Sequence, residues 1–181
     1  YRVFTELQNE QKKKGCGRMI DIAHAKQEFE KYLDEYDRED EQICLKIVHT
    51  YGVMKYAGEI ARKMECSGED VELAELIGLL HDIGKMMIAD DVLLKKDRLT
   101  IAEFNLVKTH VLHGNNILKK MNLDPRIAEV AMRHHERCDG SGYPGGYKRN
   151  QIDPFSKIVA IADTYDAMTS DRTYRSAICP F

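Results

Sequence analysis

Apolar side chains recur along most of the chain at the spacing of one face of a helix. In residues 71–81 leucine and isoleucine fall three and four positions apart, which predicts a helix with a strong apolar stripe. Comparable stripes occupy residues 21–36, 41–65 and 100–121. Asp124-Pro125 and Asp153-Pro154 are each typical of a helix start. No segment alternates with a period of two, so the pattern predicts an all-α fold.

Several polar residues predict where these helices begin and end. Ser67 precedes Asp70, and Thr100 precedes Glu103, by the three positions of a capping box. Gly84 is expected to end the helix that comes before it. In the helix predicted to begin at Asp153-Pro154, the residues expected to be buried are Ile158, Val159, Ile161 and Ala162.

Composition and charge narrow the class of protein. Hydrophobic residues make up 43% and charged residues 31% of 181 residues, which is typical of a globular domain. Lys plus Arg number 27 and Asp plus Glu 30, so the net charge is -3 and binding to a nucleic-acid polymer is not expected. No apolar run approaches the ~20 residues of a membrane span. The five scattered cysteines form no CxxC pair, which favours free thiols in the cytoplasm.

Histidines and carboxylates recur on the predicted helices in a pattern that favours a metal site. The candidates are His49, His81-Asp82, His110, His134-His135-Glu136 and Asp163. Taken singly, an HD dipeptide or a histidine on an apolar helix face is more often structural. Asp163 follows an apolar run, however, and a buried carboxylate needs a partner or a metal. Mixed imidazole and carboxylate ligands suit iron, manganese, zinc or nickel better than magnesium or calcium.

Three motifs resemble those of one enzyme family and occur in the family's order. Residues 81–85 (HDIGK) match the HD motif of metal-dependent phosphohydrolases. Residues 134–144 (HHERCDGSGYP) match the long signature of HD-GYP domains, and residues 163–172 (DTYDAMTSDR) resemble the segment that follows it. The resemblance covers about residues 40–181 and identifies the chain as similar to HD-GYP cyclic di-GMP phosphodiesterases.

The resemblance implies a fold and an activity. The fold is an HD-domain bundle of about five core helices around a metal centre, with extra HD-GYP helices. The activity is hydrolysis of cyclic di-GMP, or a related cyclic dinucleotide, by a metal-activated hydroxide. Two divalent transition metals are implied, with iron or manganese favoured and zinc or nickel as alternatives.

The resemblance also implies roles for particular residues. The metal ligands are His49, His81, Asp82, His110, His134, His135 and Asp163, with Asp82 bridging. Asp82 and Lys85 are the catalytic candidates, and Lys85 and Arg172 are expected to face phosphate. Three residues of the glycine-rich loop 139–146 are further substrate-binding candidates: Gly142, Tyr143 and Pro144. The alternative role of Tyr143-Pro144 is to shape the loop or contact a partner.

Two positions depart from the family pattern. A basic residue is expected three positions after His49, where this chain has Gly52. Some members hold a third metal through a glutamate four positions before that histidine, and here the position is Leu45. We therefore expect two metals. The alternative functions are a catalytically weak or inactive HD-GYP sensor or scaffold, and an HD phosphohydrolase of another nucleotide.

The remaining expectations concern organisation and partners. Residues 1–19 are predicted to be a linker or the end of an upstream element, and residues 20–181 an HD-GYP domain. The sequence stops shortly after Arg175, so the domain is expected to be truncated at its C-terminus. Besides a cyclic dinucleotide substrate, the expected partners are an upstream sensory domain or diguanylate cyclase, and a second copy in a homodimer.

Overall fold

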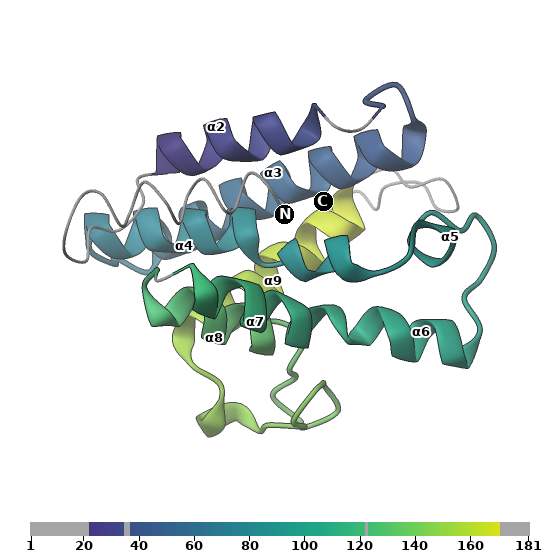
Figure 1. The fold of residues 1–181 in the computed structure, drawn as a ribbon. Helices are drawn as coiled ribbons and strands as arrows, with labels where there is room; N and C mark the ends of the chain where they lie inside the picture. Colours follow the sequence, from purple (N-terminus) through teal and green to yellow (C-terminus); the bar gives the residue numbers. More distant parts are fainter. Residues whose placement is uncertain (1–21, 35–36, 122, 171–181) are drawn as a thin grey trace. The chain divides into compact units, whose positions relative to one another are not determined.

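The computed structural model describes residues 22–34, 37–121 and 123–170, and it is built from helices and loops (Figure 1). Within these residues the β pairing consists of one isolated antiparallel bridge between Asp139 and Lys148. The all-α prediction is therefore confirmed. The described residues belong to two compact units, one reaching Leu79 and resuming at Ile158, the other spanning Leu80–Lys157.

The first unit is organised around one long helix, α3 (Glu41–Lys63). Its other helices are α2 (Ile22–Leu33), α4 (Gly68–Leu80) up to Leu79, and α9 (Pro154–Thr169) from Ile158. The Tyr51 hydroxyl on α3 donates to Glu30 on α2 at 2.5 Å. A Cβ at Gly78 would lie 2.7 Å from the Met54 Cα, so α4 and α3 approach backbone to backbone. Gly78 thus allows α4 to lie close against α3.

The second unit contains the shorter helices. They are η1 (Ile83–Met87), α5 (Asp90–Leu93), α6 (Ile101–Lys108), α7 (His110–Lys120), α8 (Pro125–Arg133) and η2 (Arg149–Gln151). Helix α7 packs against both η1 and α8. A Cβ at Gly84 would lie 1.9 Å from the His110 carbonyl oxygen, so only glycine allows η1 to lie on α7. The buried Asn115 amide donates to the Ala128 carbonyl at 2.7 Å and joins α7 to α8.

The predicted helix starts are confirmed. The Thr100 and Glu103 capping box is complete, the Ser67 hydroxyl accepts from the Asp70 amide at 3.1 Å, and Asp124 caps α8. Helix α9 begins at Pro154, as predicted.

Four local predictions are wrong. Gly84 does not end the preceding helix: α4 ends at Leu80, and Gly84 lies inside η1. Glycine is needed at this position because η1 contacts α7 closely there. The single helix expected over 100–121 is divided at Thr109. Val48, on the apolar stripe predicted for residues 41–65, and Ile161 are expected from the sequence to point inward but are 53% and 57% exposed. Helical spacing marks an apolar stripe, but it does not fix which edge of the stripe is covered.

Some expectations fall on residues that the structure does not describe. Residues 1–19, Arg172, Arg175 and the end of the chain lie outside the described ranges. The domain boundaries at 1–19 and 20–181 therefore stay predictions. Within the described ranges, Cys44, Cys66 and Cys138 are free thiols. The described helices include none with the combined length and apolar character that a membrane span needs.

Candidate metal centre

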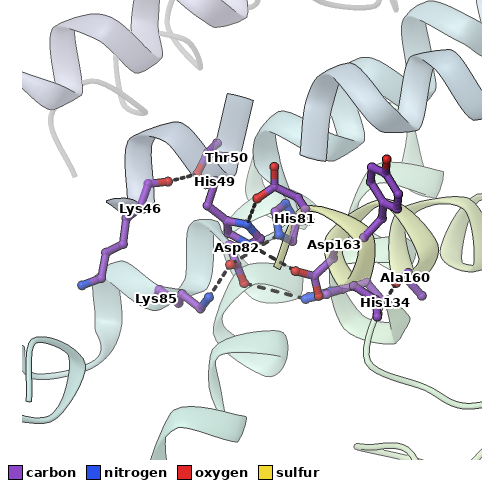
Figure 2. A network of polar contacts seen from close by, with 12 residues as sticks. Lys46, His49, Thr50, His81, Asp82, Lys85, His134, Ala160 and Asp163 are labelled. Carbon is purple, nitrogen blue, oxygen red and sulfur yellow. Dashed lines mark hydrogen bonds and ion pairs between the residues drawn. The ribbon is translucent and has the colours of Figure 1, made fainter. Parts of the chain in front are cut away.

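In the second unit, helix ends bring four of the predicted ligands together. Asp82 is the N-cap of η1, His110 is the first residue of α7, and His134 follows the last residue of α8. Their ligand atoms and those of His135 all lie within 4.8 Å of one another. His110 and His134 are each 1% exposed. Figure 2 shows Lys85 and His134 both directed at Asp82.

The hydrogen bonds of the two buried histidines define which ring nitrogen is available. Nδ1 of His110 lies 2.7 Å from the Val107 carbonyl oxygen, and Nδ1 of His134 lies 3.0 Å from that of Ala131. A carbonyl can only accept, so each Nδ1 carries the hydrogen and each Nε2 presents a lone pair. This is the tautomer that a metal requires of an Nε2 ligand.

These lone pairs point at another acceptor. Oδ1 of Asp82 lies 3.3 Å from Nε2 of His110 and 3.7 Å from Nε2 of His134. All three atoms are buried and none makes a hydrogen bond. Buried acceptors that face one another are unfavourable unless a cation lies between them. The donor set therefore fits a divalent transition metal.

The surroundings lower the pKa values of Asp82 and His134, which favours the charged carboxylate and the neutral imidazole that bind metals. Burial alone raises the pKa of the Asp82 carboxyl, but Lys85, His81 and the other two neighbouring histidines together hold the pKa well below its ordinary value. Burial lowers the pKa of His134 despite the opposing effect of Asp82, which favours the neutral ring that binds metals. Lys85 forms an ion pair with Asp82, and Nε2 of His81 lies 3.3 Å from the same carboxylate.

In the first unit, a second group joins α3 to α9. Nε2 of His49 lies 3.1 Å from Oδ1 of Asp163, and Nδ1 of the same ring lies 2.6 Å from Oδ2 of Asp166 (Figure 2 labels His49 and Asp163). The side chains of His49 and Asp163 are 14% and 18% exposed. Asp166, which the sequence did not single out, is buried at 5%. His49 thus lies between two carboxylates.

The glycine-rich loop is anchored by a buried carboxylate. Glu136 is 3% exposed, and its two oxygens accept from the main-chain amides of Gly145 at 2.6 Å and Tyr147 at 2.9 Å. The loop stacks Tyr143 on His135 with ring centroids 4.8 Å apart. The sequence indicated Glu136 only as part of the His134-His135-Glu136 cluster and did not predict that it anchors the loop. Its position directly after two histidines and before a glycine-rich loop was the available signal.

The predicted site residues therefore fall into groups. The second unit brings together Asp82, His110, His134 and His135, with His81 and Lys85 beside Asp82. The first unit brings together His49 and Asp163. In the loop, a Cβ at Gly142 would lie 2.4 Å from the Arg137 amide nitrogen, so glycine is needed there for close backbone packing. Pro144 is exposed, and Arg172 lies outside the described residues.

Comparison with solved structures supports the fold. The chain is similar to an HDG"Y"P protein from Bdellovibrio bacteriovorus, with a TM-score of 0.58 and 24% identity. The match covers 66% of this chain and 40% of that one.

Comparison with curated proteins finds named enzymes. A cyclic di-GMP phosphodiesterase of Pseudomonas aeruginosa is 40% identical over 71% of this chain, and one of Thermotoga maritima is 44% identical over 71%. A 3'3'-cGAMP-specific phosphodiesterase of Vibrio cholerae is 35% identical over 72%. The chain spans 31%, 35% and 28% of the lengths of these relatives. The family model for the HD domain matches residues 18–180, so the chain belongs to the HD domain family.

Proposed function

We propose that this chain is a metal-dependent phosphodiesterase domain of the HD-GYP type that hydrolyses a cyclic dinucleotide, cyclic di-GMP first. The observation that carries the proposal is the convergence of His110, His134 and Asp82 through buried atoms that make no hydrogen bond. The names of the relatives supply the substrate class, and residues 134–144 supply the HD-GYP assignment.

The proposed centre takes two divalent ions, with iron or manganese favoured over zinc or nickel because the ligands mix imidazole and carboxylate. When bound, such ions acidify water and neutralise the charge that develops on a phosphodiester. The proposed ligands are His49, His81, Asp82, His110, His134, His135 and Asp163, as the sequence resemblance assigns them.

The side chains have distinct tasks in this proposal. Asp82 would hold the ions through its carboxylate, whose pKa lies well below its ordinary value. Lys85 pairs with Asp82 and, being 32% exposed, is accessible to a phosphate oxygen of the substrate. Tyr143, stacked on His135, offers an aromatic ring beside the ligands, and a nucleobase can stack on such a ring. Arg172 is proposed as a second phosphate contact.

The test is metal analysis of anaerobically purified protein together with hydrolysis of cyclic di-GMP and 3'3'-cGAMP. We expect two metals per chain, hydrolysis of at least one dinucleotide, and loss of both metal and activity in His134→Ala. Hydrolysis of neither dinucleotide by metal-loaded protein would overturn the proposal and favour the sensor or scaffold alternative. Three fully occupied metals would contradict the count, because Leu45 cannot supply a ligand.

The wider setting is also proposed from the sequence. We propose that an upstream sensory domain or a diguanylate cyclase supplies the input and that the domain acts as a homodimer. A cytoplasmic location agrees with the free thiols of Cys44, Cys66 and Cys138.

A further inference from the structure

His49 differs from His110 and His134 in which group accepts the hydrogen bond from its Nδ1 atom. His110 and His134 lie at helix ends, where carbonyls one turn earlier accept from their Nδ1 atoms. His49 lies inside α3, where the carbonyls of the preceding turn are already used by helical hydrogen bonds. The nearby Lys46 carbonyl also accepts from the Thr50 hydroxyl at 2.9 Å (Figure 2). The acceptor at Nδ1 of His49 is instead a carboxylate from another helix, at 2.6 Å.

Asp166 on α9 supplies that acceptor from 117 positions away. Its Oδ2 lies 2.6 Å from Nδ1 of His49, and a carboxylate can only accept, so the hydrogen is on Nδ1. In the neutral ring Nε2 then keeps the lone pair, and it lies 3.1 Å from Oδ1 of Asp163, so both atoms are available to one cation. We propose that Asp166 is a positioning residue that fixes the tautomer and direction of His49 for metal binding. The inference rests on the proposed function only in taking His49 as a ligand.

Gly52 leaves the space that Asp166 needs. It lies three positions after His49, on the same face of α3. A Cβ at Gly52 would lie 1.8 Å from Oδ1 and 2.6 Å from Cγ of Asp166. The Asp166 side chain can rotate away from such a Cβ, but the rotation breaks its 2.6 Å hydrogen bond to His49. Glycine at 52, where the resemblance implied a basic residue, is thus part of the arrangement and no sign of a degenerate site.

The competing explanation is that Asp166 only contributes to packing between α3 and α9. The tautomer of His49 separates the two explanations, because packing alone does not decide which ring nitrogen carries the hydrogen. Nitrogen-15 NMR of the histidines in the metal-free, full 181-residue chain reads the tautomer directly. We expect His49 to be the Nδ1–H form in the unmodified protein and to lose this form in Asp166→Ala. Asp166→Asn keeps an acceptor oxygen and should largely retain it.

Gly52→Ala provides the second perturbation, and Gly58→Ala is its matched control. Both glycines lie on α3, and a Cβ at Gly58 would also meet a carboxylate, Oε1 of Glu75, at 2.5 Å. Glu75 pairs with Arg62 instead of a histidine. Gly52→Ala should therefore disturb the His49 tautomer, whereas Gly58→Ala should leave it unchanged whatever its cost in stability.

Metal binding gives the functional readout. We expect manganese(II) binding, measured by competition with a chelator, to weaken about 10- to 100-fold in Asp166→Ala and similarly in Gly52→Ala. The double variant should be no weaker than Asp166→Ala alone, because the alanine at 52 then meets no carboxylate. An unchanged tautomer in Asp166→Ala, or equal effects of Gly52→Ala and Gly58→Ala, would overturn the inference. Failure of the proposed function shows separately, as absent metal or hydrolysis in the unmodified protein.

Discussion

Glu136 should hold the glycine-rich loop in place, and Glu136→Gln tests this with a nearly isosteric change. The carboxylate accepts one main-chain amide on each oxygen, Gly145 at 2.6 Å and Tyr147 at 2.9 Å. The amide of glutamine keeps one acceptor and turns a donor toward the other N–H. Hydrogen bonds to charged groups contribute about 1.5–3 kcal/mol each. Losing one and weakening the other should lower the free energy of unfolding by about 2–4 kcal/mol.

Urea unfolding and amide hydrogen exchange measure the two parts of this effect. Glu129→Gln is the matched control, because its carboxylate pairs with Arg133 at 2.7 Å on the surface and is 48% exposed. Such a pair contributes about 0–1 kcal/mol. We expect the Gly145 and Tyr147 amides to lose protection only in Glu136→Gln. Hydrolysis should fall as well, because the loop carries Tyr143, which stacks on His135.

Equal urea midpoints for the two glutamine variants, with both loop amides still protected, would contradict this role of Glu136. The loop would then be held by its other contacts, including the Asp139–Lys148 bridge.

Further predictions concern the capping box, the packing glycine and the lysine. Thr100→Ala should destabilise the protein by about 0.5–2 kcal/mol in urea unfolding, because α6 loses its N-cap. Hydrogen bonds from Lys95 and then Thr100 lower the pKa of Glu103 to about 2, below its ordinary 4.5. Its contribution is therefore complete above about pH 4.5 and is lost as the pH falls toward 2, and melts of Glu103→Gln should show a weaker decline over that range. Gly84→Ala should prevent η1 from packing on α7 and lower both the melting midpoint and metal content. Lys85→Ala should reduce kcat/KM about 10- to 100-fold with metal content near normal, and a metal-free variant would contradict its assignment to phosphate.

Helix starts were predictable because their signals are local. A capping box such as Thr100 with Glu103 depends on residues three positions apart, and Asp124-Pro125 on adjacent ones. The break at Thr109 and the exposure of Ile161 were not predictable, because they depend on which neighbouring helix covers each face. Gly84 could not be explained from the sequence either. Glycine is needed there because the His110 carbonyl, 26 positions away, lies too close for a side chain, and not because a helix ends there.

For the candidate site, too, the sequence predicts some features and not others: it predicts which residues are ligands, but not how their rings are oriented. A ligand can be recognised from its residue type and its place in a motif, so His110, His134 and Asp82 could be predicted. Whether Nε2 of a histidine can bind a metal depends on what Nδ1 contacts, and here the contacts are main-chain carbonyls or the distant Asp166. Main-chain acceptors leave no signature in the sequence, and Asp166 shows only as one more acidic residue. Gly52 is the partial exception: its departure from the expected basic residue pointed to this corner of the site. From the sequence alone the departure indicates a lost function, whereas in the structure the Asp166 carboxylate occupies the space that a side chain at 52 would need.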